Sequence, residues 1–236
     1  MSANLEQQTI SPQTTPTPAA GCGNPTHQRT LIWNISKLLF HVLAVRLFRF
    51  KAYGTEHIPR TGGVLLASTH QSYLDPILIA ILLQRPVTYL ASQYLFDVPV
   101  MGWLIRQVNA FPVQQGKGDR AAINTAIAAL KDGRALAVYP EGHRTANGEI
   151  MQLHGGIALI ARKAGVPIVP IVIDGAFAAW PRSTKLPRPH PVHLMYGEPI
   201  QTNGKDAGQI MAELQTRLHA MFQELQNRRS GSGWEQ

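Results

Sequence analysis

Two residues that can share a proton, His70 and Asp75, lie five positions apart in the stretch Thr69–Pro76 (THQSYLDP). This stretch follows an apolar run, 63–68, that reads as a strand, and active residues of α/β proteins gather at the carboxyl ends of strands. Pro76 favours the first position of a helix, which predicts that the residues before Asp75 form a loop with Asp75 as N-cap. Such a loop can curl so that the carboxylate meets one ring nitrogen and leaves the other as a base. The alternative is a capping Asp75 beside a surface His70.

A second polar stretch, Tyr139–Thr145 (YPEGHRT), follows another apolar run, 135–139. Arg144 can bind a phosphate with two parallel hydrogen bonds, and Gly142 allows the backbone to approach a ligand. Glu141 can hold the arginine or accept a hydrogen bond from a substrate hydroxyl. The residues assigned to substrate binding in this stretch are Glu141, Gly142, Arg144 and Thr145. The alternative is an ordinary Pro-Glu-Gly turn that carries a surface arginine.

The rest of the chain predicts an α/β fold in which a largely parallel or mixed sheet is flanked by helices, with an N-terminal amphipathic membrane-associating helix. Short apolar runs bounded by Gly and Pro alternate with helical stretches, which is typical of a sheet covered on both faces. Pro170 lies inside one predicted strand and indicates a bulge or a sheet edge there. The predicted strands are 63–68, 87–91, 109–113, 135–139, 168–173 and 192–196, and the predicted helices are 76–84, 99–107, 119–131, 155–164 and 206–228.

The two ends of the chain differ in character from this central part. Residues 1–28 are rich in Ser, Thr, Pro and Gln and predict a flexible tail, and 229–236 predict a flexible C-terminus. Within 29–53, residues 31–50 place apolar side chains on one helical face and Lys and Arg at its borders. This pattern predicts a helix in the headgroup layer of a membrane, and an amphipathic helix packed on the domain core is the alternative. The folded domain would then be 54–228.

Composition narrows the classes of protein further. The chain has 236 residues, 44% hydrophobic and 15% charged, which excludes a disordered polyampholyte and a coiled coil. The net charge of +8 favours an anionic partner. The single cysteine, Cys22, excludes a disulfide framework and a cysteine-based zinc site, and the nine histidines show no ligand spacing, so no metal is predicted. No apolar run is long enough for a clean transmembrane span.

Together, HQSYLDP and YPEGHRT resemble the first and third sequence blocks of the glycerolipid acyltransferase family, typified by 1-acylglycerol-3-phosphate acyltransferases. The second block of that family has a counterpart in Asn109–Val113 and the fourth in Val166–Ile171. The resemblance covers Gly54 to Pro199, with the four blocks in the family's order and spacing. It implies that His70 is the general base and that Asp75 orients it.

The chain departs from the family pattern at several positions that bear on the acceptor. Thr69 stands where the family usually has Asn, Gln115 where the second block continues into Arg, and Leu153-His154 where a Phe-Lys-like pair follows the third block. Lys117 and Arg120 can compensate for the missing cations, because they flank the N-terminus of the predicted helix 119–131, whose N–H groups favour an anion. A plain turn is the alternative for these two residues.

The implied activity is transfer of a fatty acyl group from acyl-CoA or acyl-carrier protein to a hydroxyl of a lysolipid, 1-acylglycerol-3-phosphate first. No cofactor is expected beyond that co-substrate, and no covalent acyl-enzyme is required. The expected partners are the lysolipid, the acyl donor and the membrane surface on its cytoplasmic side, without nucleic acid, because no aromatic-basic binding motif is present. Two alternatives stay open: a different lipid acceptor, such as a lysophospholipid or an amino-acid lipid, and a non-catalytic lipid-binding protein.

Overall fold

A seven-stranded mixed sheet forms the centre of the protein in the computed structural model, which describes residues 42, 45–92, 96–97, 110–113, 120–184 and 186–230. The strand order is β1-β7-β6-β2-β5-β3-β4, and β6 and β7 are the antiparallel pair. The strands are β1 (Lys51–Tyr53), β2 (Val64–Ser68), β3 (Val87–Ser92), β4 (Ala110–Val113), β5 (Ala135–Val138), β6 (Ile168–Asp174) and β7 (His193–Tyr196).

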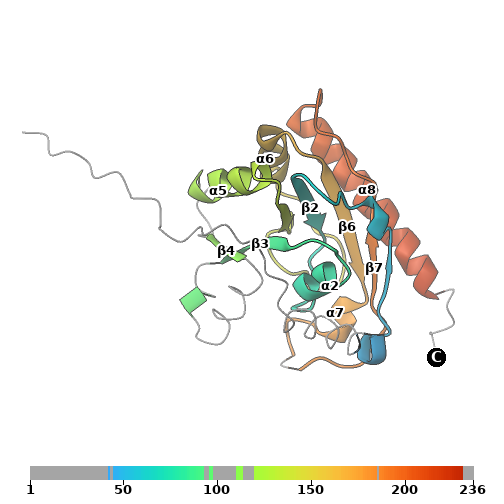
Figure 1. Cartoon of the computed structure of the whole chain (residues 1–236). Helices are drawn as coiled ribbons and strands as arrows, with labels where there is room; N and C mark the ends of the chain where they lie inside the picture. The colour runs from blue at the N-terminus through green and yellow to red at the C-terminus, as the bar shows by residue number, and fades with distance from the viewer. Residues whose placement is uncertain are drawn as a thin grey trace, which may run out of the picture.

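Helices cover both faces of this sheet (Figure 1). They are η1 (Thr55–His57), α2 (Asp75–Ile81), α5 (Arg120–Lys131), α6 (Gly156–Ala164), α7 (Ala176–Ala179) and α8 (Ala207–Ser230). Alternate residues of the central strand β2 point to opposite faces: Leu66 packs in the cluster that includes α2 and α7, and Leu65 packs in the cluster that includes α5, α6 and α8. All five residues of β2 are buried, which explains why the first four are a continuous apolar run.

The register of the central strands brings two loops to the same edge of the sheet. β2 is parallel to β5, with Leu66 opposite Ala137, and parallel to β6, with Leu66 opposite Val169. Because the carboxyl ends of parallel strands meet at one edge, the loop that follows β2 lies beside the loop that follows β5. These are the two stretches that carry the predicted chemistry.

The predicted α/β class is confirmed, and the sheet is of the mixed kind. Three short elements were not predicted: β1, η1 and α7, each of three or four residues, too short for a hydrophobic period to develop. The predicted helix 99–107 lies outside the described residues. The predicted flexible end 229–236 is wrong for residues 229 and 230, which belong to α8, where Arg229 pairs with Asp174 at the end of β6.

Pro170 was expected at a bulge or a sheet edge. The edge is wrong, because β6 lies between β2 and β7 inside the sheet. The ladder is irregular beside Pro170, but the extra residue is not in β6: Ile168 pairs with Ile200 and Ile171 with Tyr196, so two residues of β6 lie opposite three, 197–199, of the segment after β7. A proline is tolerated there because the ladder is interrupted.

The membrane-associating helix predicted within 29–53 lies largely outside the described residues. Residues 45–48 are helical, and Phe48 and Phe50 are buried in the same cluster as α2. For these two side chains the core alternative therefore holds, whereas Val42 and Val45 are exposed. Among the described helices, none combines the length and the hydropathy needed to cross a bilayer.

Gly175, between β6 and α7, is a position where the fold tolerates a side chain poorly. Its φ of 85° is left-handed, and a Cβ would lie 2.1 Å from the carbonyl oxygen of Pro191. Gly165 has a similar φ of 69° but open space around it. We therefore expect Gly165→Ala to lower the free energy of unfolding by about 1 kcal/mol, and Gly175→Ala to lower it clearly more. Urea unfolding of both variants checks this, and equal losses would show that the Pro191 contact is unimportant.

Candidate active site

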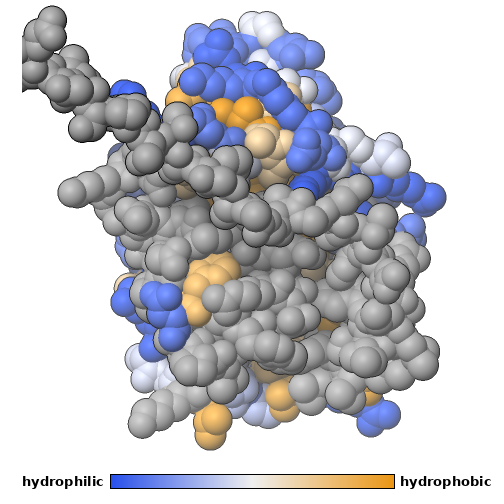
Figure 2. All heavy atoms as spheres, turned by 60° about the vertical axis from the view of Figure 1, so that its left-hand side comes forward, coloured by the Kyte–Doolittle hydropathy of each residue, from blue (hydrophilic) through white to orange (hydrophobic). Residues whose placement is uncertain are grey.

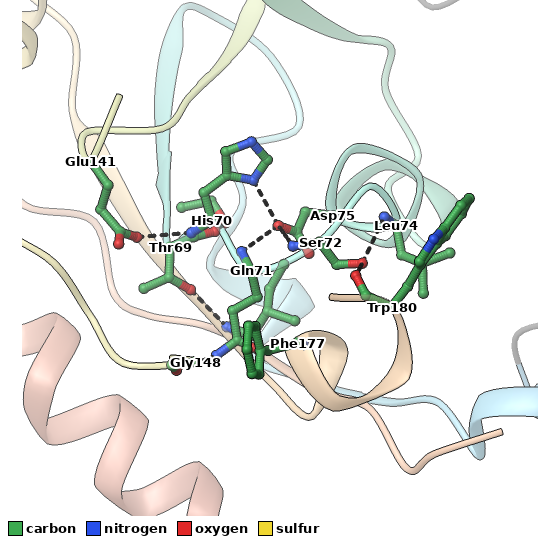
Figure 3. A network of polar contacts seen from close by, with 12 residues as sticks. Thr69, His70, Gln71, Ser72, Leu74, Asp75, Glu141, Gly148, Phe177 and Trp180 are labelled. Atoms are coloured by element: carbon green, nitrogen blue, oxygen red, sulfur yellow. Dashed lines mark hydrogen bonds and ion pairs between the residues drawn. The ribbon is translucent and has the colours of Figure 1, made fainter. Parts of the chain in front are cut away.

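The carboxylate of Asp75 organises the loop after β2. It is fully buried, and its Oδ2 accepts hydrogen bonds from His70 Nδ1 (2.8 Å), the backbone N–H of Gln71 (2.7 Å) and that of Ser72 (2.8 Å), as Figure 3 shows. A buried carboxylate needs such donors to remain charged. The expected contact between His70 and Asp75 is therefore present in the structure.

The expected N-cap role of Asp75 is wrong. α2 begins at Asp75 itself, Leu74 holds the N-cap position, and no side chain caps the helix. The carboxylate turns back to the preceding loop because three donors converge there. This removes the alternative in which Asp75 only caps a helix and His70 is an unconnected surface residue.

The imidazole of His70 is held on two sides. An ionised carboxylate only accepts hydrogen bonds, so in the neutral form of the ring this contact places the proton on Nδ1 and the lone pair on Nε2. In Figure 3 the second ring nitrogen points away from Asp75. Tyr139 stacks on a face of the imidazole, with 3.8 Å between ring centroids. Burial, and after it the charge of Asp75, raises the pKa of the Tyr139 hydroxyl well above its usual range. The side chain of His70 keeps 18% exposure, which leaves room for contact with a substrate.

The loops after β2 and β5 are joined by direct hydrogen bonds. The N–H of His70 donates to Glu141 Oε1 (2.8 Å), and the N–H of Thr145 donates to the carbonyl oxygen of His70 (2.8 Å). Gln71 Nε2 adds a bond to the carbonyl oxygen of Gly148 (2.8 Å). The two predicted motifs therefore form one connected unit.

Glu141 is placed as a brace for the backbone. It is buried, and its second oxygen accepts from the N–H of Met151 (3.0 Å). Burial raises the pKa of Glu141, while the backbone hydrogen bonds from Met151 and His70 counteract that rise. Both oxygens already have a backbone donor, so the visible role of Glu141 is to position His70, and its expected role in holding the acceptor stays a prediction.

The other predicted residues of this stretch have different surroundings. Gly142 is exposed with a φ of 75°, and a Cβ there would lie 3.3 Å from the ring of His154. Thr145 is buried, and its hydroxyl donates to Asn147 and accepts from the backbone of the same turn, which makes it a structural residue. Arg144 is partly buried, with its guanidinium carbon 3.5 Å from the ring centroid of Tyr73.

The two cations predicted before helix α5 are not brought to this site by the described contacts. Lys117 lies outside the described residues. Arg120 begins α5 and borders a cavity of about 520 Å³, which is lined by Arg120, Ile123, Asn124, Leu159 and Lys163. Figure 2 shows this end of the molecule, where a small apolar area lies among hydrophilic side chains. The role of Lys117 and Arg120 as an anion site stays a prediction.

Sequence reasoning missed two residues that hold the loop after β2. Gln71 Oε1 accepts from the N–H of Phe177 (3.1 Å), so Gln71 bridges α7 and the loop that carries Gly148. Thr69 Oγ1 accepts from the N–H of Ile173 in β6 (3.1 Å). Their burial next to His70 is not visible in the sequence, since both are polar residues in a loop-like stretch.

Comparison with known proteins shows the family to which the chain belongs. A family model described as acyltransferase matches residues 49–174, more than half of the chain. The chain belongs to the acyltransferase family. The matched region contains both site loops, and the family's relatives identify it as a glycerolipid acyltransferase of the 1-acyl-sn-glycerol-3-phosphate acyltransferase type.

Three relatives illustrate the match. The 1-acyl-sn-glycerol-3-phosphate acyltransferase of Bacillus subtilis is 28% identical over 183 residues, which cover 75% of this chain and 88% of that protein. The lyso-ornithine lipid O-acyltransferase of Pseudomonas aeruginosa is 32% identical over 64% of this chain and 55% of its own length. The solved 1-acyl-sn-glycerophosphate acyltransferase of Thermotoga maritima has a TM-score of 0.70 and 25% identity, over 82% of this chain and 79% of that one.

The brace formed by Glu141 can be tested by a change of one atom. Glu141→Gln keeps one acceptor oxygen and turns the other into an NH₂ group, which cannot accept from a backbone N–H. Because a buried N–H is left without a partner, we expect the free energy of unfolding to fall by about 1–3 kcal/mol in urea titrations. Exposed Glu149→Gln on the same loop is the matched control and should unfold like the wild type. An equally stable Glu141→Gln protein would contradict the brace.

Proposed function

We propose that the enzyme transfers a fatty acyl group from acyl-CoA or acyl-carrier protein to the hydroxyl of 1-acylglycerol-3-phosphate, which yields phosphatidic acid. The observation that carries the proposal is the contact between His70 Nδ1 and the buried Asp75 carboxylate, on a loop joined to the one that carries Arg144. The family of the chain supports lipid acyl transfer in general, and these contacts support the finer assignment.

His70 and Asp75 have distinct roles in the proposed reaction. An alcohol is a poor nucleophile at neutral pH, so His70 Nε2 takes the hydroxyl proton as the oxygen attacks the thioester carbonyl. Asp75 keeps the ring in the productive tautomer and stabilises the imidazolium that forms. When the tetrahedral intermediate collapses, the C–S bond breaks and the proton passes from His70 to the thiolate. The products are an ester and a free thiol, and the base returns to its initial state.

Arg144 supports an anionic acceptor. Its Nη1 is buried and has no hydrogen-bond partner among the residues that the structure describes. A buried guanidinium N–H without an acceptor is costly, and a phosphate oxygen would satisfy it. We therefore assign the phosphate of the acceptor to Arg144, with Gly142 leaving space at the adjacent turn.

A second acceptor class is favoured by two observations. The similar Pseudomonas aeruginosa protein is named for a lyso-ornithine lipid, and this chain has His154 where a Phe-Lys-like pair is expected from the family pattern. His154 lies against the Gly142 turn, so an uncharged or singly charged headgroup could meet an imidazole there. A panel of lysolipids separates the two classes.

The site would work at a membrane surface on its cytoplasmic side, as a peripheral or monotopic protein. The net charge of +8 favours an anionic bilayer, and both the acceptor and the product are lipids. Since Phe48 and Phe50 pack in the core, any membrane-facing apolar surface of the 31–50 segment has to come from residues before them.

The test is release of free thiol from palmitoyl-CoA in the presence of 1-acylglycerol-3-phosphate, a lysophospholipid or lyso-ornithine lipid. We expect the first acceptor to give the highest rate, and His70→Ala to lower that rate by about 10²–10⁴-fold because the base is lost. His219→Ala, an exposed histidine on α8, is the matched control.

Wild-type turnover in a folded His70→Ala protein would overturn the assignment of the base. A higher rate with lyso-ornithine lipid would replace the acceptor. Binding of lysolipid without any thiol release would favour the non-catalytic alternative.

A further inference from the structure

Tyr73 is a large aromatic residue that remains 46% exposed inside the loop organised by Asp75. Its ring contacts the guanidinium carbon of Arg144, 3.5 Å from the centroid, and the indole of Trp180, with 5.3 Å between centroids. No hydrogen bond of the Tyr73 hydroxyl is found within the described part of the chain. The contacts of Tyr73 are therefore made by its ring.

At 3.5 Å from the ring centroid, the guanidinium carbon of Arg144 is close enough that a face of the group has to lie on the ring, because an N–H pointing at the ring would hold the carbon farther away. The N–H groups of a guanidinium lie in its plane, so a face-on aromatic ring does not compete with acceptors at its edge. An aromatic ring also limits the rotamers of a long side chain that otherwise loses entropy on binding. Arg144 keeps one buried donor, Nη1, without a partner among the described residues.

The position of Tyr73 in the chain links this stack to the base. Tyr73 lies three residues after His70, and its neighbour Ser72 is anchored twice: its N–H donates to Asp75 Oδ2 and its Oγ donates to the carbonyl oxygen of Trp180. The ring therefore stands on the same fixed loop as the imidazole. Arg144 belongs to the loop after β5, and its contact with Tyr73 aligns it with the loop after β2.

We propose that Tyr73 is a positioning residue that holds the Arg144 guanidinium by a cation–π stack, so that its edge meets the anionic group of the acceptor at a set distance from His70. This inference rests on the proposed function and adds a residue to it. It also assigns the aromatic ring, and not the hydroxyl, as the functional part of Tyr73.

The experiment compares Tyr73→Phe, Tyr73→Leu, Arg144→Ala and the double variant in the thiol-release assay. We expect Tyr73→Leu to raise the KM for 1-acylglycerol-3-phosphate about fivefold to tenfold with kcat nearly unchanged, because a partly desolvated cation–π contact is lost. Tyr73→Phe should keep the wild-type KM, because it retains the aromatic ring. In the Arg144→Ala background, Tyr73→Leu should have no further effect on KM, because the partner of the ring is already gone.

Tyr53→Leu is the matched control, because Tyr53 in β1 also has an arginine over its ring, Arg228 of α8, at 4.9 Å from the ring centroid. It should leave the KM unchanged. Three outcomes would overturn the positioning role. The KM of Tyr73→Leu could be unchanged, or the KM of Tyr73→Phe could be as high as that of Tyr73→Leu. The third outcome is that Tyr73→Leu lowers both kcat and the free energy of unfolding, which would show a structural role.

A second measurement separates this inference from the proposed function. Calorimetric binding of 1-acylglycerol-3-phosphate in neutral detergent, without an acyl donor, needs no acyl transfer. If the wild type binds this lipid and Tyr73→Leu binds it several-fold more weakly than Tyr73→Phe, the stack is supported even where thiol release is absent. Equal binding by all three proteins overturns it, and so does the absence of binding by the wild type.

Discussion

The burial of one carboxylate constrains most of this site. Asp75 has no exposed surface, and a charge in that environment is tolerated only where donors meet it. All three donors meet Oδ2, whereas Oδ1 is buried without a partner among the described residues. The donors come from the loop directly before it: one imidazole nitrogen and two backbone N–H groups. The loop after β2 therefore wraps around its own Asp75, and the orientation of His70 follows from the same set of hydrogen bonds.

The sheet and its short helices hold this loop from outside. Because β2 and β5 pair in parallel, the loop that carries Glu141 lies beside the loop after β2. The helix α7 connects the antiparallel strands β6 and β7 and packs in the same core cluster as α2. Gln71 then reaches both neighbours, with its oxygen on α7 and its nitrogen on the β5 loop. His70 lies on the loop after β2, and Glu141 and Arg144 both lie on the loop after β5, and direct hydrogen bonds join the two loops. This suits the proposed reaction, in which two substrates have to meet in a fixed geometry.

Much of this arrangement could be predicted from particular residues. The apolar runs that became β2 and β5 placed both motifs at one sheet edge, and the spacing of His70 and Asp75 allowed their contact. Other features depend on tertiary burial and have no local signal. Glu141 looked like a substrate ligand because its two backbone donors are distant in sequence, and Asp75 looked like a helix cap because the convergent N–H groups are a property of the folded loop. Tyr73 showed no pattern that would reveal a stack on a residue of another loop.

The central claim is that Asp75 sets the tautomer of His70 and leaves Nε2 as the base. The most direct test is ¹⁵N nuclear magnetic resonance of histidine-labelled protein at a pH where the ring is neutral, with His70→Ala used to assign the signal. The account predicts a proton on Nδ1 and a free lone pair on Nε2 in the wild type, and loss of this preference in Asp75→Asn. A wild-type ring that carries its proton on Nε2 would contradict the account.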